Sequence, residues 1–172
     1  MEKTEAILSD LMLDLSLASA LPMAREGRNK IRMTASVSAI GCISQDLSPK
    51  ELRSLEYAIG PLLSLMASDI EEPLAAKAAS TLRTLMASRV CMKQLITCNG
   101  LIIIGKIFDT LLSVTRALDL IIESVSSSVL EHLAAVYKMV SLFYPWEIVR
   151  VGAIRHCVTL LKRGGITLKT NA

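Results

Sequence analysis

Apolar residues recur at helical spacing along the chain, and one stripe of them occurs three times. In residues 75–88 they lie at i, i+3, i+4, i+7, i+10 and i+11, which is one face of an α-helix. This stripe consists of Ala75, Ala78, Ala79, Leu82, Leu85 and Met86. Mostly apolar stripes stand 42 residues earlier, at Met33, Ser36, Val37, Ile40, Ile43 and Ser44, and 54 residues later, at Val129, His132, Leu133, Val136, Met139 and Val140. The pattern predicts three amphipathic helices.

A second type of helix is predicted between these three. The stretches "AIGPLLSLM" (58–66), "GLIIIGKIF" (100–108) and "GAIRHCVTLL" (152–161) follow one another at offsets of 42 and then 53 residues. Two helix types therefore recur at nearly one period, and no segment alternates as a strand would. Repetition near 40 residues in an all-helical chain is the sequence signature of an α-solenoid.

Several residues predict where helices begin and turn. Ser48-Pro49-Lys50-Glu51 has the form of a capping box with proline in the first turn, so we expect a helix to start there. Ser128 and Glu131 form a second such box, which predicts the start of the third striped helix. Gly100 and Gly152 allow two consecutive helices to meet at a sharp angle.

The repeating unit resembles the armadillo repeat. The segment "EIVRVGAIRHCVTLL" (147–161) is similar to the first half of that family's pattern, and "KAASTLRTLMAS" (77–88) to the second half. The resemblance covers about residues 30–161. HEAT repeats are the near alternative, but they lack the glycine before the second helix, which Gly100 and Gly152 supply here. In the first copy Tyr57 or Ala58 stands in its place.

The resemblance implies an all-α fold: a right-handed α-solenoid of about three armadillo-like repeats, incomplete at the C-terminal end. We expect residues 1–28 to form an N-terminal capping helix and loop, and residues 29–163 to form the repeats. A segment of about residues 109–128 is an insertion, which either extends the second helix or adds another. Residues 164–172 are expected to be a flexible tail.

Composition refines this expectation. Hydrophobic residues make up 52% of the 172 residues but aromatic residues only 3%, so the core must consist of Leu, Ile, Val, Met and Ala. A net charge of +3 is too small to favour nucleic acid. The most apolar window, residues 101–122, holds four charged side chains, which argues against a membrane span.

The residues capable of chemistry show no catalytic spacing. The four cysteines form no CxxC pair, and reduced, buried thiols are the expectation. His132 falls on the third stripe, so we expect a core histidine held by one hydrogen bond. His156 stands beside Cys157, and a reactive or metal-binding couple is the weaker alternative there. We therefore expect no enzyme, cofactor, metal or small-molecule substrate.

The armadillo resemblance implies a partner-binding groove along the third helices. Import adaptors of that family bind nuclear signals through Trp and Asn on these helices, and the matching positions here hold neither, so that activity is rejected. The expected groove residues are Ser38, Cys42, Ser80, Arg83, Thr84, Tyr137 and Lys138. A merely solvated face is the alternative.

Two further surfaces are candidates for binding. The stretch "FYPWEI" (143–148) gathers Phe143, Tyr144 and Trp146, which would serve as interface anchors or would fill a junction between helices. The last copy stops after its second helix, so Val158 and Leu161 are expected to lack cover. Uncovered solenoid ends expose apolar surface, which predicts a partner or self-association.

The sequence thus predicts a non-enzymatic scaffold or adaptor for other proteins, a subunit of a larger assembly. The alternative is an RNA-binding helical-repeat protein that uses a basic stretch, Arg25, Arg28, Lys30 and Arg32. No targeting signal is recognised, so the cytoplasm is the expected location. Armadillo proteins also serve cytoskeletal and ciliary complexes, which leaves those associations open.

Overall fold

The protein is all-helical over the residues that its computed structural model describes, which are residue 10 and residues 28–67, 72–117 and 125–163. No strand occurs in these ranges. The elements are α2 (Arg28–Asp46), the 3₁₀-helix η2 (Glu51–Ala58), α3 (Ile59–Ala67), α4 (Glu72–Leu85), α5 (Arg89–Thr97), α6 (Gly100–Ala117), α7 (Val125–Ser141), α8 (Pro145–Arg150) and α9 (Ala153–Arg163). The expected capping helix within residues 1–28 and the tail at 164–172 lie outside the described residues, apart from Asp10 and the first residue of α2.

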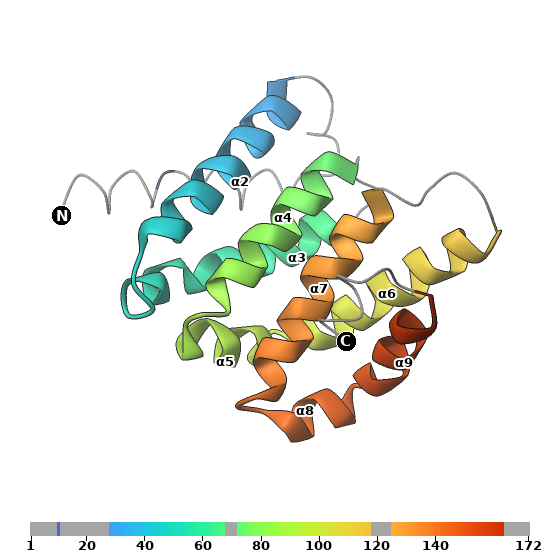
Figure 1. Ribbon diagram of the computed structural model, residues 1–172. Coiled ribbons are helices and arrows are strands. Elements are labelled where there is room, and N and C mark those ends of the chain that lie inside the picture. Colours follow the sequence, from blue (N-terminus) through green and yellow to red (C-terminus); the bar gives the residue numbers. More distant parts are fainter. Residues whose placement is uncertain (1–9, 11–27, 68–71, 118–124, 164–172) are drawn as a thin grey trace.

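The helices that carry the first stripe pack against one another. α2 lies along α4, and α4 lies along α7, as Figure 1 shows. The second predicted type forms its own series, because α3 packs on α6 and α6 packs on α9. Among the short elements, η2 packs on α3 and α5, α5 also packs on α6, and α8 contacts both α7 and α9. Helices of one predicted type therefore meet helices of the same type.

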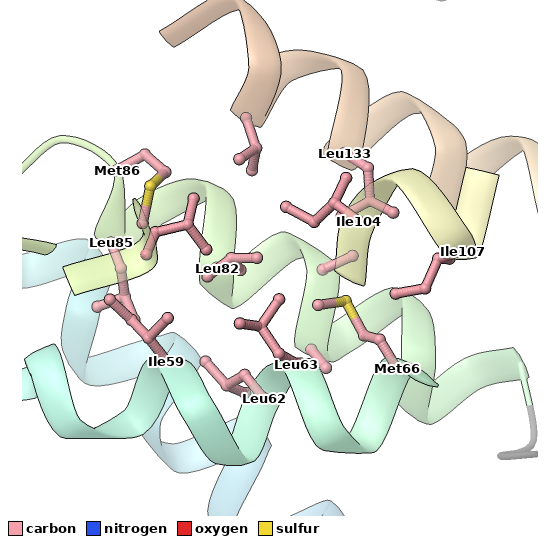
Figure 2. Packing of buried hydrophobic residues seen from close by; sticks show 14 of the residues in the cluster. Ile59, Leu62, Leu63, Met66, Leu82, Leu85, Met86, Ile104, Ile107 and Leu133 are labelled. Atoms are coloured by element: carbon pink, nitrogen blue, oxygen red, sulfur yellow. The ribbon is translucent and has the colours of Figure 1, made fainter. Parts of the chain in front are cut away.

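The predicted stripes form the core. Val37 and Ile40 on α2, and Leu82 and Leu85 on α4, are fully buried. Figure 2 shows how side chains of α3, α4, α6 and α7 point toward one another between the helices. Leu, Ile, Val, Met and Ala dominate this cluster, as the low aromatic content predicts. Small residues such as Ala78 and Ala79 are also fully buried, which lets the helix axes approach closely.

The two predicted capping boxes have different outcomes. The amide N–H of Ser48 donates to Glu51 Oε2 at 2.9 Å, as a capping box requires, and the Ser48 hydroxyl donates to the same oxygen. The element that follows is the 3₁₀-helix η2 instead of an α-helix. The second prediction is wrong, because α7 already begins at Val125 and Ser128 lies inside it.

The glycine junctions are confirmed. Asn99 has φ of +57° and Gly152 has φ of +72°, both in the left-handed region that ends a helix. The axes of α5 and the first part of α6 differ by 74°. The segment expected as an insertion begins within α6, which has 18 residues where α3 has 9. Residues 118–124 of that insertion lie outside the description.

Candidate protein-binding surfaces

Six of the seven expected groove residues reach the surface along α2, α4 and α7. Cys42, Arg83 and Lys138 are exposed, and Ser38, Ser80 and Thr84 are half-buried. The Thr84 hydroxyl donates to the carbonyl of Ser80 on its own helix, at 3.3 Å. The exposure of Cys42 also corrects the expectation that all four thiols are buried.

The seventh residue, Tyr137, was wrongly predicted to face a partner. Its side chain is buried, its ring stacks on Phe108 of α6 at 5.3 Å between centroids, and its hydroxyl donates to the Leu101 carbonyl at 3.3 Å. The difference arises from packing between helices, because the ring contacts Phe108 and the backbone of Leu101 on α6, which the repeat register does not take into account. Burial raises the pKa of Tyr137, which keeps the phenol protonated.

Lys77 is a residue of this surface that the sequence analysis missed. Its ammonium group donates to the Ser38 hydroxyl at 3.1 Å, from α4 to α2. Lys77 lies one turn before Ser80 on the same side of α4, so helical spacing alone could have found it. With Arg83 and Lys138 it makes three exposed basic side chains on α4 and α7.

The aromatic stretch 143–148 divides between core and surface. Tyr144 packs against the core, whereas Trp146 is 81% exposed in the first turn of α8. Phe143 is partly exposed, and the Arg89 guanidinium lies 4.4 Å above its ring centroid. Such a cation–π contact fixes the Phe143 ring. Trp146 is therefore the aromatic side chain of this stretch that is most open to a partner.

The expected lack of cover on α9 is seen in the exposed fractions of its side chains. Ile154, Val158 and Leu161 are 55%, 43% and 45% exposed. They lie at i, i+4 and i+7, so they form one apolar stripe, which we call the α9 stripe. The opposite side of α9 is buried through Ala153, His156 and Leu160.

A polar and aromatic cluster joins α6, α7 and α9, and the sequence analysis did not find it. The His156 ring stacks on Phe108 at 5.3 Å, and its Nε2 lies 3.1 Å from Asp109 Oδ1. Arg155 donates to the other Asp109 oxygen at 2.7 Å. His156 Nδ1 is buried without a hydrogen-bond partner among the described residues. His156 thus contacts Asp109, and the alternative of a His156–Cys157 couple receives no support.

His132 is half-buried on α7 instead of lying fully in the core. Its buried Nδ1 has no hydrogen-bond partner in the described part of the chain. Burial, and next the positive charge of Arg83, lower the pKa of His132 against the opposing effect of Glu131. The ring is therefore held neutral at pH 7.

This lowered pKa predicts how stability changes with pH. Below about pH 6.5 the unfolded chain protonates His132 before the folded chain does, so stability should fall as the pH drops toward the folded pKa. Urea denaturation at about pH 7.5 and 5.5 measures this loss. We expect a smaller loss in His132→Gln than in the unchanged protein, and equal losses would contradict the assignment.

The remaining chemistry gives no candidate catalytic or metal centre among the described residues. Burial raises the pKa of the Cys91, Cys98 and Cys157 thiols, which weakens them as nucleophiles. No group of three or more His, Cys, Asp or Glu side chains there is placed to hold a metal ion.

Within the described residues, no single helix is both long and apolar enough to cross a membrane. The helix α5 and the first part of α6 pass that test together, as a bent pair.

The basic stretch of the RNA-binding alternative is not described in its side chains. Arg25 lies outside the described residues, and Arg28, Lys30 and Arg32 belong to the first turns of α2. The structure therefore provides no side-chain arrangement that supports RNA binding by this stretch.

In comparisons with protein-family models, curated proteins and solved structures, nothing matches this chain.

Proposed function

We propose that this protein is a non-enzymatic scaffold for other proteins, built as a short armadillo-like α-solenoid and acting as a subunit of a larger assembly. The packing of like helices in two series, α2–α4–α7 and α3–α6–α9, supports a solenoid. The two helix types recur at nearly the same offsets, 42 residues and then 53 or 54, which supports the armadillo resemblance.

One observation carries the proposal. Among the described residues, ten large hydrophobic side chains are exposed, and seven of them lie between positions 142 and 161. These seven are Leu142, Phe143, Trp146, Val149, Ile154, Val158 and Leu161. Exposed apolar side chains concentrated in one part of a protein mark an interaction site, and an exposed tryptophan is a typical anchor of such a site.

The proposal predicts contact at Trp146 in the cell. A photo-crosslinking amino acid at position 146 should yield a discrete adduct with a partner protein, because this ring is 81% exposed amid other exposed apolar residues. The matched control carries the same group at Tyr57 on η2, which is 70% exposed but lies outside the 142–161 segment. Adducts of equal yield at both positions, or at neither, would contradict the proposal.

A further inference from the structure

The α9 stripe occupies positions that the earlier repeats keep buried. In the register of the second helix type, Ile154, Val158 and Leu161 correspond to Leu101, Gly105 and Phe108 of α6, 53 residues earlier. A further 42 residues back they correspond to Ile59, Leu63 and Met66 of α3. All six of these earlier residues are buried.

In both earlier repeats a following helix of the same type provides the cover. On α3, Leu63 lies against the first residue of α6, since a Cβ on Gly100 would lie 2.8 Å from its Cδ1 atom. On α6, Phe108 is covered by His156 of α9, whose ring stacks on it. The α9 stripe therefore has the position and the apolar character of a surface on which one more such helix packs.

Charge selects among possible helices. α9 contains no acidic residue, and besides Arg155, which is paired with Asp109 of α6, it carries Lys162 and Arg163. Pairing α9 with α9 of a second copy would bring like charges together, which is unfavourable. The favoured occupant is a leucine-rich helix with a negative charge.

The chain itself contains such a segment. Residues 6–21, "AILSDLMLDLSLASAL", precede α2 as α3 precedes α4, so in the repeat order they hold the place of a second helix. Residues 1–21 carry four acidic side chains, Glu2, Glu5, Asp10 and Asp14, against one basic side chain, Lys3. On a helix, Leu8, Leu11 and Leu15 would form a stripe with Asp14 at its border, and Asp10 one turn before Asp14. The segment thus complements the α9 stripe in both apolarity and charge.

The segment must come from a second copy. α2 packs on α4 and α4 on α7, while α9 lies beyond α6 in the other series, so α2 and the outer side of α9 are three or more helix layers apart. At about 8–10 Å per layer this is roughly 30 Å. Residues 22–27, which link the segment to α2, span at most about 20 Å when fully extended.

We propose that residues 6–21 of one copy dock on the α9 stripe of the next, which assembles this protein head to tail. Because the two faces differ, the contact is heterologous and leaves one free face at each end of the chain of copies. This inference rests on the proposed solenoid, whose uncovered end it assigns to a second copy.

A mixing experiment tests the assignment. Light scattering should show a mass that rises with concentration for the full-length protein. Val158→Asp/Leu161→Asp removes one face, and Leu11→Asp/Leu15→Asp removes the other, so each variant alone should remain at 18.7 kDa. An equimolar mixture of the two should form particles of twice that mass, because each variant retains the face that the other lacks. Ile102→Asp, at an exposed position of α6 outside the stripe, should assemble like the unchanged protein.

Other results would overturn the inference. A mixture that stays monomeric while the unchanged protein associates would mean that like faces pair. A strictly monomeric unchanged protein, or binding of anionic lipid vesicles to the α9 stripe of the Leu11→Asp/Leu15→Asp variant, would mean that the occupant is different. Circular dichroism confirms beforehand that each variant is folded. The crosslinking at Trp146 tests partner binding separately, so a monomer that still forms that adduct would leave the proposed function intact.

Discussion

Replacing Phe108 with alanine should lower the free energy of unfolding by about 3–5 kcal/mol, the usual cost of removing a buried aromatic ring. Phe108 is fully buried, and its ring lies 5.3 Å from the Tyr137 ring and 5.3 Å from the His156 ring, measured between centroids. The substitution therefore leaves a cavity where α6, α7 and α9 meet. Urea denaturation followed by circular dichroism measures the loss.

Two other variants make the Phe108 experiment decisive. Ile102→Ala removes a partly exposed side chain from the same helix, and we expect it to cost about 1 kcal/mol or less. If Phe108→Ala does not fold, Phe108→Leu, which keeps most of the apolar volume, should remain folded and be less stable than the unchanged protein. Equal losses for Phe108→Ala and Ile102→Ala would show that the three-ring stack is not part of the core.

The second large effect is expected at Gly100. A Cβ there would lie 2.4 Å from Leu95 Cδ1, 2.8 Å from Leu63 Cδ1 and 2.8 Å from the Leu95 carbonyl oxygen. Side chains can move, but the carbonyl belongs to the backbone of the last turn of α5. Gly100→Ala should therefore cost about 1–3 kcal/mol, as overpacking of a core does, in spite of the better helix propensity of alanine.

Gly60 is the matched control for this substitution. It lies in α3, where a Cβ would meet no atom within 4 Å outside its two chain neighbours and the backbone of its own helix. Its gain in helix propensity, about 1 kcal/mol, is opposed by the clash between a Cβ and the ring of the following Pro61. We therefore expect Gly60→Ala to change stability by less than about 1 kcal/mol. Thermal unfolding of both variants compares them directly, and equal losses would contradict the close packing at Gly100.

Local periodicity was sufficient to predict much of the helical structure and which side of each helix is buried. The spacing of Ala78, Leu82 and Leu85 determines which side of α4 is apolar, and burial of that side follows in any compact arrangement. The sharp turns at Asn99 and Gly152 could also be predicted from the sequence, because a left-handed backbone conformation favours these residue types. Two of the three residues of the α9 stripe, Val158 and Leu161, were predicted to lack cover because the repeat pattern stops after this helix. Ile154 was not predicted.

Other features depend on how helices cross. The repeat register placed Tyr137 opposite a partner, as the equivalent of the exposed Arg83, yet its ring is buried against Phe108 of α6. Ser128 has the form of a cap, but α7 begins three residues earlier, at Val125. In both cases a local rule gave the wrong answer, because packing and helix extension were decided outside the motif.

The sequence by itself determined the helix types, their apolar sides, their sharp turns and the end at which apolar residues stay exposed. The first three depend on neighbours within a few turns of the same helix, and the last on where the repeat pattern stops. Only the tertiary structure brought Asp109 to within 3.1 Å of His156, 47 residues further along the chain, and gathered the rings of Phe108, Tyr137 and His156 into one cluster. Those contacts depend on the angles and separations of three helices, which no single periodic pattern encodes.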